Sequence, residues 1–116
     1  MPEFISLIFF KSSAGREPMR DWLLELGEAD RRVIGQDLQR LQYRWPVGMP
    51  LARHLADGVW EVRSNLPGGK IGRVLFCAHD GALIALHGFM KKTQKTPPAE
   101  LNLALTRMRA IKGDRP

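Results

Sequence analysis

The chain has 116 residues, of which 44% are hydrophobic, and a formal net charge of +6 at pH 7. This length and apolar content predict one domain, residues 1–116, with enough core to fold alone. The single cysteine, Cys77, excludes an internal disulfide framework and is expected to be a small buried residue, because its surroundings are apolar. The apolar stretch 4–10 is too short for a membrane span and lacks the features of a signal peptide, so we expect a cytoplasmic protein without a membrane partner.

The positive charge lies in the second half of the sequence. Residues 1–58 contain eight Lys or Arg and eight Asp or Glu, whereas residues 59–116 contain ten basic and four acidic residues. This asymmetry favours a polyanionic partner, with nucleic acid the first choice. The alternative is a basic surface that serves only solubility.

The N-terminal part predicts a strand followed by two helices. Phe4 to Phe10 is nearly continuous in apolar residues, which predicts a strand covered on both faces, inside the sheet. Pro18 opens a helix that Gly27 ends. Asp30 is the expected N-cap of a second helix that reaches Pro46. The short connection predicts an antiparallel helical hairpin laid on the sheet.

Residues 46 to 58 contain several turn-forming residues and predict a loop. His54 lies in this loop and is expected to be a solvated polar residue, because no cysteine or second histidine stands at the spacing of metal ligands. The sequence also contains no Walker loop or dinucleotide-binding glycine motif. We therefore expect neither a metal nor a cofactor.

The stretch Val59 to Lys95 predicts a meander of three strands that carries the candidate site. Glu61 and Arg63 share one face of its first strand, because side chains alternate along a strand. If the first turn is symmetric about Gly68, Arg63 lies opposite Arg73 on the second strand. Two like charges in this position repel each other unless an anion lies between them. Glu61 lies diagonally nearby and offsets part of the repulsion. Removing Arg73 would relieve its repulsion with Arg63, so the stability of the fold is expected to fall little or even to rise.

Two further signals complete the predicted architecture. Asp80-Gly81 is typical of a two-residue type I′ turn, which sets Arg73 opposite Gly88 unless the register slips. Pro97-Pro98 opens a C-terminal helix whose apolar stripe ends at Ile111; this helix either packs on the free sheet face or meets a partner. The predicted fold class is α+β. Its elements run strand, helix, helix, strand, strand, strand, helix, with a small, mostly antiparallel sheet and the helical hairpin on one face.

Three motifs in the meander carry a family resemblance. They are Trp-Glu-x-Arg from Trp60, Gly-Arg-Val-Leu-Phe from Gly72, and Leu-His-Gly-Phe from Leu86, which Lys-Lys-Thr-Gln-Lys-Thr-Pro-Pro follows from Lys91. With these motifs the chain resembles the RelE/HigB superfamily of type II toxin–antitoxin toxins, in its phage-derived HigB-like branch. The resemblance covers nearly the whole chain, and the motif from Leu86 is its most specific part.

The resemblance implies a RelE-like fold and an mRNA interferase, an endoribonuclease that inhibits translation by cutting messenger RNA on the ribosome. It also implies a cognate antitoxin, in this branch typically a helix-turn-helix protein. The positions that it marks as catalytic are Glu61, Arg63, Arg73 and His87. Lys91 and Lys92 match the basic end of the family's last strand, and together with Lys95 they are expected to bind RNA backbone phosphates. The best-known members have a tyrosine near the C-terminus, whereas the only tyrosine of this chain is Tyr43.

The proposed chemistry fits these residue types. Attack of a ribose 2′-hydroxyl on the neighbouring phosphate builds negative charge, which Arg63 and Arg73 would stabilise. Glu61 or His87 would transfer the protons. The structural alternatives are an ion pair for Glu61 and a buried, hydrogen-bonded position for His87. For the whole protein, the alternative is a non-catalytic nucleic-acid-binding or antitoxin-binding relative with the same fold.

Overall fold

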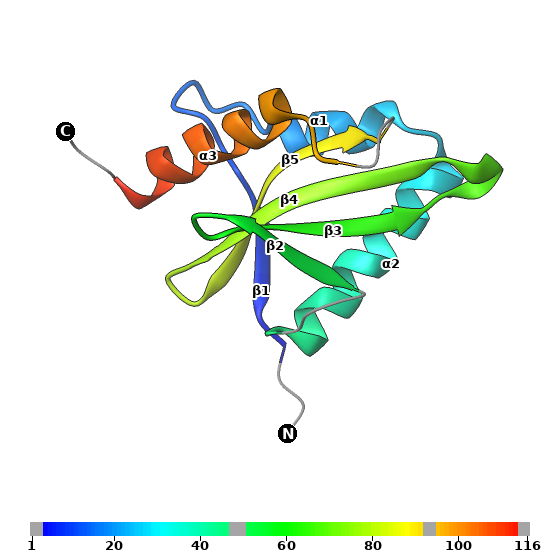
Figure 1. Cartoon of the computed structure of the whole chain (residues 1–116), viewed down its shortest axis with the longest axis horizontal. Coiled ribbons are helices and arrows are strands. Elements are labelled where there is room, and N and C mark those ends of the chain that lie inside the picture. The colour runs from blue at the N-terminus through cyan, green and yellow to red at the C-terminus, as the bar shows by residue number, and fades with distance from the viewer. Residues whose placement is uncertain (1–3, 47–50, 92–94, 114–116) are drawn as a thin grey trace.

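One mixed sheet of five strands forms the centre of the molecule, with helices on both of its faces (Figure 1). The computed structural model describes residues 4–46, 51–91 and 95–113. Its elements are β1 (Ser6–Phe9), α1 (Pro18–Glu25), α2 (Glu28–Arg44), β2 (Ala52–Ala56), β3 (Val59–Asn65), the short 3-10 turn η1 (Pro67–Gly69), β4 (Ile71–His79), β5 (Ala82–Met90) and α3 (Pro98–Lys112). The strand order is β1-β5-β4-β3-β2. The predicted α+β class is confirmed, with one strand more than predicted, and the fold is consistent with a RelE-like one.

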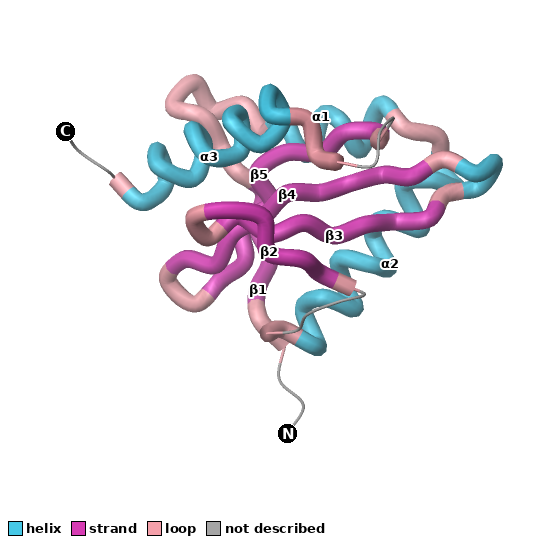
Figure 2. Tube along the Cα trace, in the orientation of Figure 1, coloured by secondary structure: helices cyan, strands magenta, loops and turns pink. Residues whose placement is uncertain are grey.

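Alternate residues of β4 divide the core into two layers. Leu75 and Cys77 belong to the layer under α3, which includes Met108. Val74 and Phe76 point the other way and pack in the layers that contain residues of α1 and α2. The helices in Figure 2 accordingly cover both faces of the sheet. α3 therefore packs on the sheet, which was one of its two predicted positions. None of the described helices is long and apolar enough to cross a membrane.

The first strand lies at an edge of the sheet, so the prediction of an interior position for Phe4–Phe10 was wrong. β1 pairs with β5 alone, in parallel. Its alternate side chains Leu7 and Phe9 pack under the helices, whereas Phe4 and Ile8 are 57% and 52% exposed. The apolar run misled the prediction because only one face of this strand is covered.

Residues 52–56 form β2, where the sequence predicted a loop. β2 pairs antiparallel with β3 and sets Arg53 opposite Glu61. The connecting residues Asp57 and Gly58 both have positive φ angles, 51° and 91°. Asp-Gly is a strong signal for a hairpin turn. The strand was missed because this signal was read as the end of a loop.

The second helix begins earlier than predicted. Gly27 is its N-cap, so Asp30 lies inside the first turn of α2 and is not the cap. Asp30 is instead buried, and its Oδ2 atom lies 2.5 Å from Nζ of Lys70. This ion pair ties the start of α2 to the turn between β3 and β4. The predicted starts of α1 at Pro18 and α3 at Pro98 are confirmed.

The register of the meander is confirmed at one hairpin and shifted at the other. Arg63 lies opposite Arg73, as predicted. The turn at Asp80-Gly81 also forms, but an irregularity between Leu75 and Phe76 shifts the later pairs by one residue. Arg73 consequently lies opposite Phe89 and not opposite Gly88.

Candidate nucleic-acid and catalytic site

The centre of the site is a buried ion pair between neighbouring strands. Arg73 Nη1 on β4 donates to Oε1 of Glu61 on β3, and the two side chains are only 2% and 3% exposed. Both belong to the sheet face that α3 partly covers, because Leu75 and Cys77 share the face of Arg73. The sequence predicted that Glu61 and Arg73 approach each other, and the structure places them in direct contact. It did not predict that both would be buried.

Two residues that the sequence analysis did not assign to the site complete the environment of Glu61. Arg53 on β2 donates from Nη2 to Glu61 Oε1 at 3.3 Å, and the Thr96 hydroxyl donates to Glu61 Oε2 at 2.6 Å. Arg73 Nη1 also lies 3.4 Å from the Thr96 hydroxyl oxygen. Both carboxylate oxygens therefore accept hydrogen bonds. The Asp57-Gly58 turn would have predicted the position of Arg53, whereas Thr96 lies within the motif that follows Leu86 but was given no role there.

Arg73 is not fully satisfied by these contacts. Its Nε atom is buried and has no hydrogen-bond partner within the described residues. A buried donor without a partner is uncommon, because the lost hydration is not replaced. The guanidinium therefore keeps unused donor capacity at the centre of the site.

Exposed cations lie around the buried pair. Arg63 is exposed, lies opposite Arg73 across the strands, and makes no ion pair with the described residues. Lys91 follows β5 directly and is partly exposed. Partial desolvation lowers the pKa of Lys91, and the positive charges of Arg73 and Arg63 lower it further. Lys91 therefore lies within electrostatic range of the two arginines.

The side-chain hydrogen-bond contacts of His87 are to residues of α3. His87 Nε2 contacts Oε1 of Glu100 on α3, and Nδ1 lies 3.4 Å from Nη1 of Arg107. Arg107 Nη1 also donates to the backbone oxygen of Leu86 at 2.8 Å. Since a guanidinium only donates, we assign His87 Nδ1 as the acceptor from Arg107. The ring proton then lies on Nε2, which donates a hydrogen bond to Glu100. This pair joins β5 to α3 beside the site.

The other predicted residues occupy varied positions. Lys95 is exposed just before α3, and Lys92 lies outside the described residues. Cys77 is buried as predicted, and burial raises the pKa of its thiol. His54 is exposed as predicted, although it lies on β2 and its Nε2 accepts from the Gly58 amide at 3.3 Å. In the described ranges no three His, Cys, Asp or Glu side chains group in a way that could hold a metal ion.

The chain matches one known protein family. The family model described as phage-derived protein Gp49-like (DUF891) matches residues 21–109. The matched region runs from α1 to the last turns of α3 and contains Arg53, Glu61, Arg73, Lys91 and Thr96. No curated protein matches the chain significantly. Because the match covers most of its length, the chain belongs to the phage-derived Gp49-like family, a family of toxin-like proteins.

Proposed function

We propose that this protein is the HigB-like toxin of a toxin–antitoxin system and that it cleaves messenger RNA on the ribosome without a metal ion. Membership of a toxin-like family supports the class of protein. The observation that carries the reaction is the cluster of Arg53, Arg63, Arg73 and Lys91 around Glu61. Four cations and one carboxylate leave this cluster with a net charge of +3, which suits the phosphates of RNA.

Arg63 is the proposed contact for the phosphate that reacts. Its guanidinium is exposed and lies next to a second cation that an anion would help to neutralise. The 2′-oxygen bonds to phosphorus as the bond from phosphorus to the 5′-oxygen breaks, which leaves a 2′,3′-cyclic phosphate, and the 5′-oxygen takes a proton from solvent water. Negative charge grows on the phosphate oxygens during this attack, and a cation fixed beside them stabilises the transition state more than the substrate. One such donor contributes on the order of 10² to 10³-fold to the rate.

The burial of Glu61 and Arg73 changes the role that we propose for them. With 2% and 3% exposure, neither side chain reaches a substrate in this conformation. They act as positioning residues: Glu61 fixes Arg73, Arg53 and Thr96, while the buried charge of Arg73 adds to the positive potential beneath the phosphate. Charges act over a longer range where little water screens them.

Lys91 is the proposed base that accepts the 2′ proton. Both oxygens of Glu61 and both ring nitrogens of His87, the candidates from the sequence, already have partners. The pKa of Lys91 is lowered, which increases the fraction of neutral amine near physiological pH. A base is most efficient when its pKa lies close to the working pH.

An antitoxin is the second proposed partner. A toxin that cuts messenger RNA must be covered or distorted when it is silent, and the positive site favours a partner that presents carboxylates to it. We propose that the antitoxin covers the meander or contacts α3, and that it is a helix-turn-helix protein. Lys92 and Lys95 are proposed to hold RNA backbone phosphates when the antitoxin is absent, and Lys91 does so only while its amine is protonated.

The function is tested by induction in a bacterial host and by mapping of messenger RNA ends on translating ribosomes. The wild-type chain should arrest growth and cut messenger RNA. Arg63→Ala should still bind ribosomes but cut about 10² to 10³-fold more slowly. Arg20→Ala, an exposed position on α1, is the matched control and should behave as wild type. A wild-type chain that binds RNA or an antitoxin without cutting would favour the non-catalytic alternative.

A further inference from the structure

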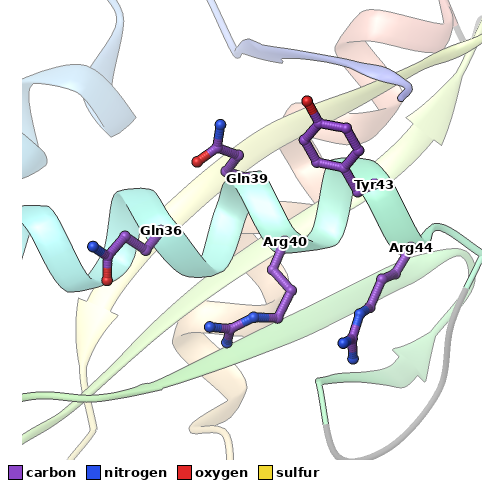
Figure 3. A pocket seen from close by; sticks show the side chains of 5 residues that line it. All are labelled: Gln36, Gln39, Arg40, Tyr43 and Arg44. Atoms are coloured by element: carbon purple, nitrogen blue, oxygen red, sulfur yellow. The ribbon is translucent and has the colours of Figure 1, made fainter. Parts of the chain in front are cut away.

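The outer face of α2 carries a hollow of about 400 Å³, on the opposite side of the sheet from Glu61 (Figure 3). It is lined by Gln36, Gln39, Arg40, Tyr43 and Arg44. The lining consists of two amides, two guanidinium groups and one phenol. Grooves that receive a protein helix are lined mainly by aliphatic and aromatic side chains. This hollow presents planar polar groups and one aromatic ring, which is the surface chemistry that unpaired nucleotides use.

Tyr43 is an exposed aromatic side chain that packs against a second ring. Its side chain is 54% exposed, and its ring centroid lies 5.3 Å from that of Phe4, with 34° between the ring planes. Contact with Phe4 restricts the tyrosine ring before any ligand arrives, so stacking a base on it costs less conformational entropy. Stacked bases tolerate sequence variation, because every base has an aromatic face.

The charge on this helix also suits an anion. α2 (Glu28–Arg44) contains four arginines and three acidic residues, a net charge of +1, and two of the acidic residues, Glu28 and Asp30, lie in its first turn, away from the hollow. Arg40 is held by Asp37 at 2.8 Å. Arg44 makes no ion pair within the part of the chain that the structure describes. Figure 3 shows the side chains of Arg40 and Arg44 extending from one flank of α2 and those of Gln39 and Tyr43 from the other.

We propose that this hollow is a second RNA-contact surface, which takes an unpaired nucleotide with its base on Tyr43 and its phosphates near Arg40 and Arg44. The proposal rests on the proposed function in that RNA is the partner. This second surface would let RNA contact both faces of the sheet, as happens when RNA surrounds a protein. The source of the nucleotide is either ribosomal RNA or the messenger.

The test measures binding of the full chain to a short, non-cleavable 2′-O-methyl oligoribonucleotide and, separately, to ribosomes. Tyr43→Ala should weaken binding between about 5-fold and about 160-fold, the range for one stacked base. Tyr43→Phe keeps the ring and should bind as wild type. Arg44→Ala should reduce the slope of log K against log salt concentration by about one. Arg32→Ala, exposed on the same helix but paired with Glu28 at 3.0 Å, is the matched control and should change neither.

The outcomes separate this proposal from the proposed function. Weakened binding to oligonucleotide and ribosome alike indicates unpaired RNA in general, and weakened binding to ribosomes alone indicates ribosomal RNA; both support the proposal. If Tyr43→Ala and Arg44→Ala bind both as wild type, the proposal is overturned, while cleavage by the wild type leaves the proposed function intact. If they bind RNA normally but lose a co-expressed antitoxin, the surface is a protein interface and the proposal is again overturned.

Discussion

The Thr96 hydroxyl donates a 2.6 Å hydrogen bond to Oε2 of Glu61, a residue 35 positions earlier in the chain. Thr96 directly precedes Pro97, the N-cap of α3. The same hydroxyl lies 3.4 Å from Arg73 Nη1. The start of α3 and the orientation of the buried ion pair are therefore fixed by one side chain.

Thr96→Val should lower the cleavage rate constant more than it changes KM. Valine has nearly the same shape but cannot donate, so Oε2 of Glu61 loses its hydrogen bond while Arg73 and Arg53 still hold Oε1. The loss of a bond to a charged acceptor should also lower the free energy of unfolding by about 1.5–3 kcal/mol. Thr96→Ser keeps the hydroxyl and should recover both quantities. Single-turnover kinetics and urea unfolding provide the measurements, and equal behaviour of the two variants would contradict a positioning role.

Arg73→Met should destabilise the fold, which reverses the expectation from the sequence. Removing one partner of a buried ion pair leaves the other charge uncompensated, at a cost of about 3–5 kcal/mol. Arg53 and Thr96 still contact Glu61, so the decrease in the free energy of unfolding should lie near the lower end of this range. The double variant Arg73→Met, Glu61→Met removes both charges and should be more stable than Arg73→Met alone. Urea unfolding of both proteins tests this, and a wild-type midpoint for Arg73→Met would show that the pair contributes nothing.

Gly88→Ala should destabilise the protein for a steric reason. A Cβ atom on Gly88 would lie 2.3 Å from a ring carbon of Trp22, so the indole or β5 must move. Overpacking of this kind costs about 1–3 kcal/mol. Gly35→Ala is the control, because nothing lies within 4 Å of its added Cβ. It lies inside α2 and should raise stability by about 0.5–1 kcal/mol. The midpoint of thermal unfolding should therefore fall for Gly88→Ala and rise for Gly35→Ala. Equal shifts of the two midpoints would contradict the steric explanation.

The sequence predicted the relationship between Arg63 and Arg73 because it depends only on the strand period and on one symmetric turn. It did not predict the second register, because the bulge beside Leu75 has no turn residue to mark it. The burial of Arg73 could not be predicted from the sequence either. It depends on where the start of α3 crosses the sheet, and this packing brings Thr96 to a partner far away in the sequence.

The charge distribution was predicted only in part. Counting charges over residues 1–58 gives neutrality and hides the arginines of α2, since five of the eight acidic residues lie between positions 17 and 30. The edge position of β1 was missed for a related reason. An apolar run indicates how much of a strand could be buried, but which faces other elements cover is decided by tertiary packing.

Lys91 should give both stability and cleavage a dependence on pH. Partial desolvation first, and then the charges of Arg73 and Arg63, lower its pKa in the folded protein. The unfolded chain has the ordinary lysine value, so between the two pKa values the unfolded state binds more protons. The free energy of unfolding should therefore rise with pH between the two pKa values. Below the folded pKa of Lys91 it should no longer depend on the titration of Lys91, and it should be lower there than at the top of the window. Lys91→Gln removes the repelled charge and should abolish this rise, as urea unfolding at several pH values would show.

The same lysine should control the pH profile of cleavage, because only its neutral form accepts the 2′ proton. The rate should increase with pH up to the folded pKa of Lys91. Lys91→Arg keeps the positive charge but cannot lose its proton in this range, so RNA binding should persist while cleavage falls by about 10² to 10⁴-fold. Lys95→Arg, at an exposed position nearby in the chain, is the matched control and should keep the wild-type profile. If Lys91→Arg cleaves at the wild-type rate with the wild-type profile, the 2′ proton goes to another group, and Lys91 serves only to attract the phosphate.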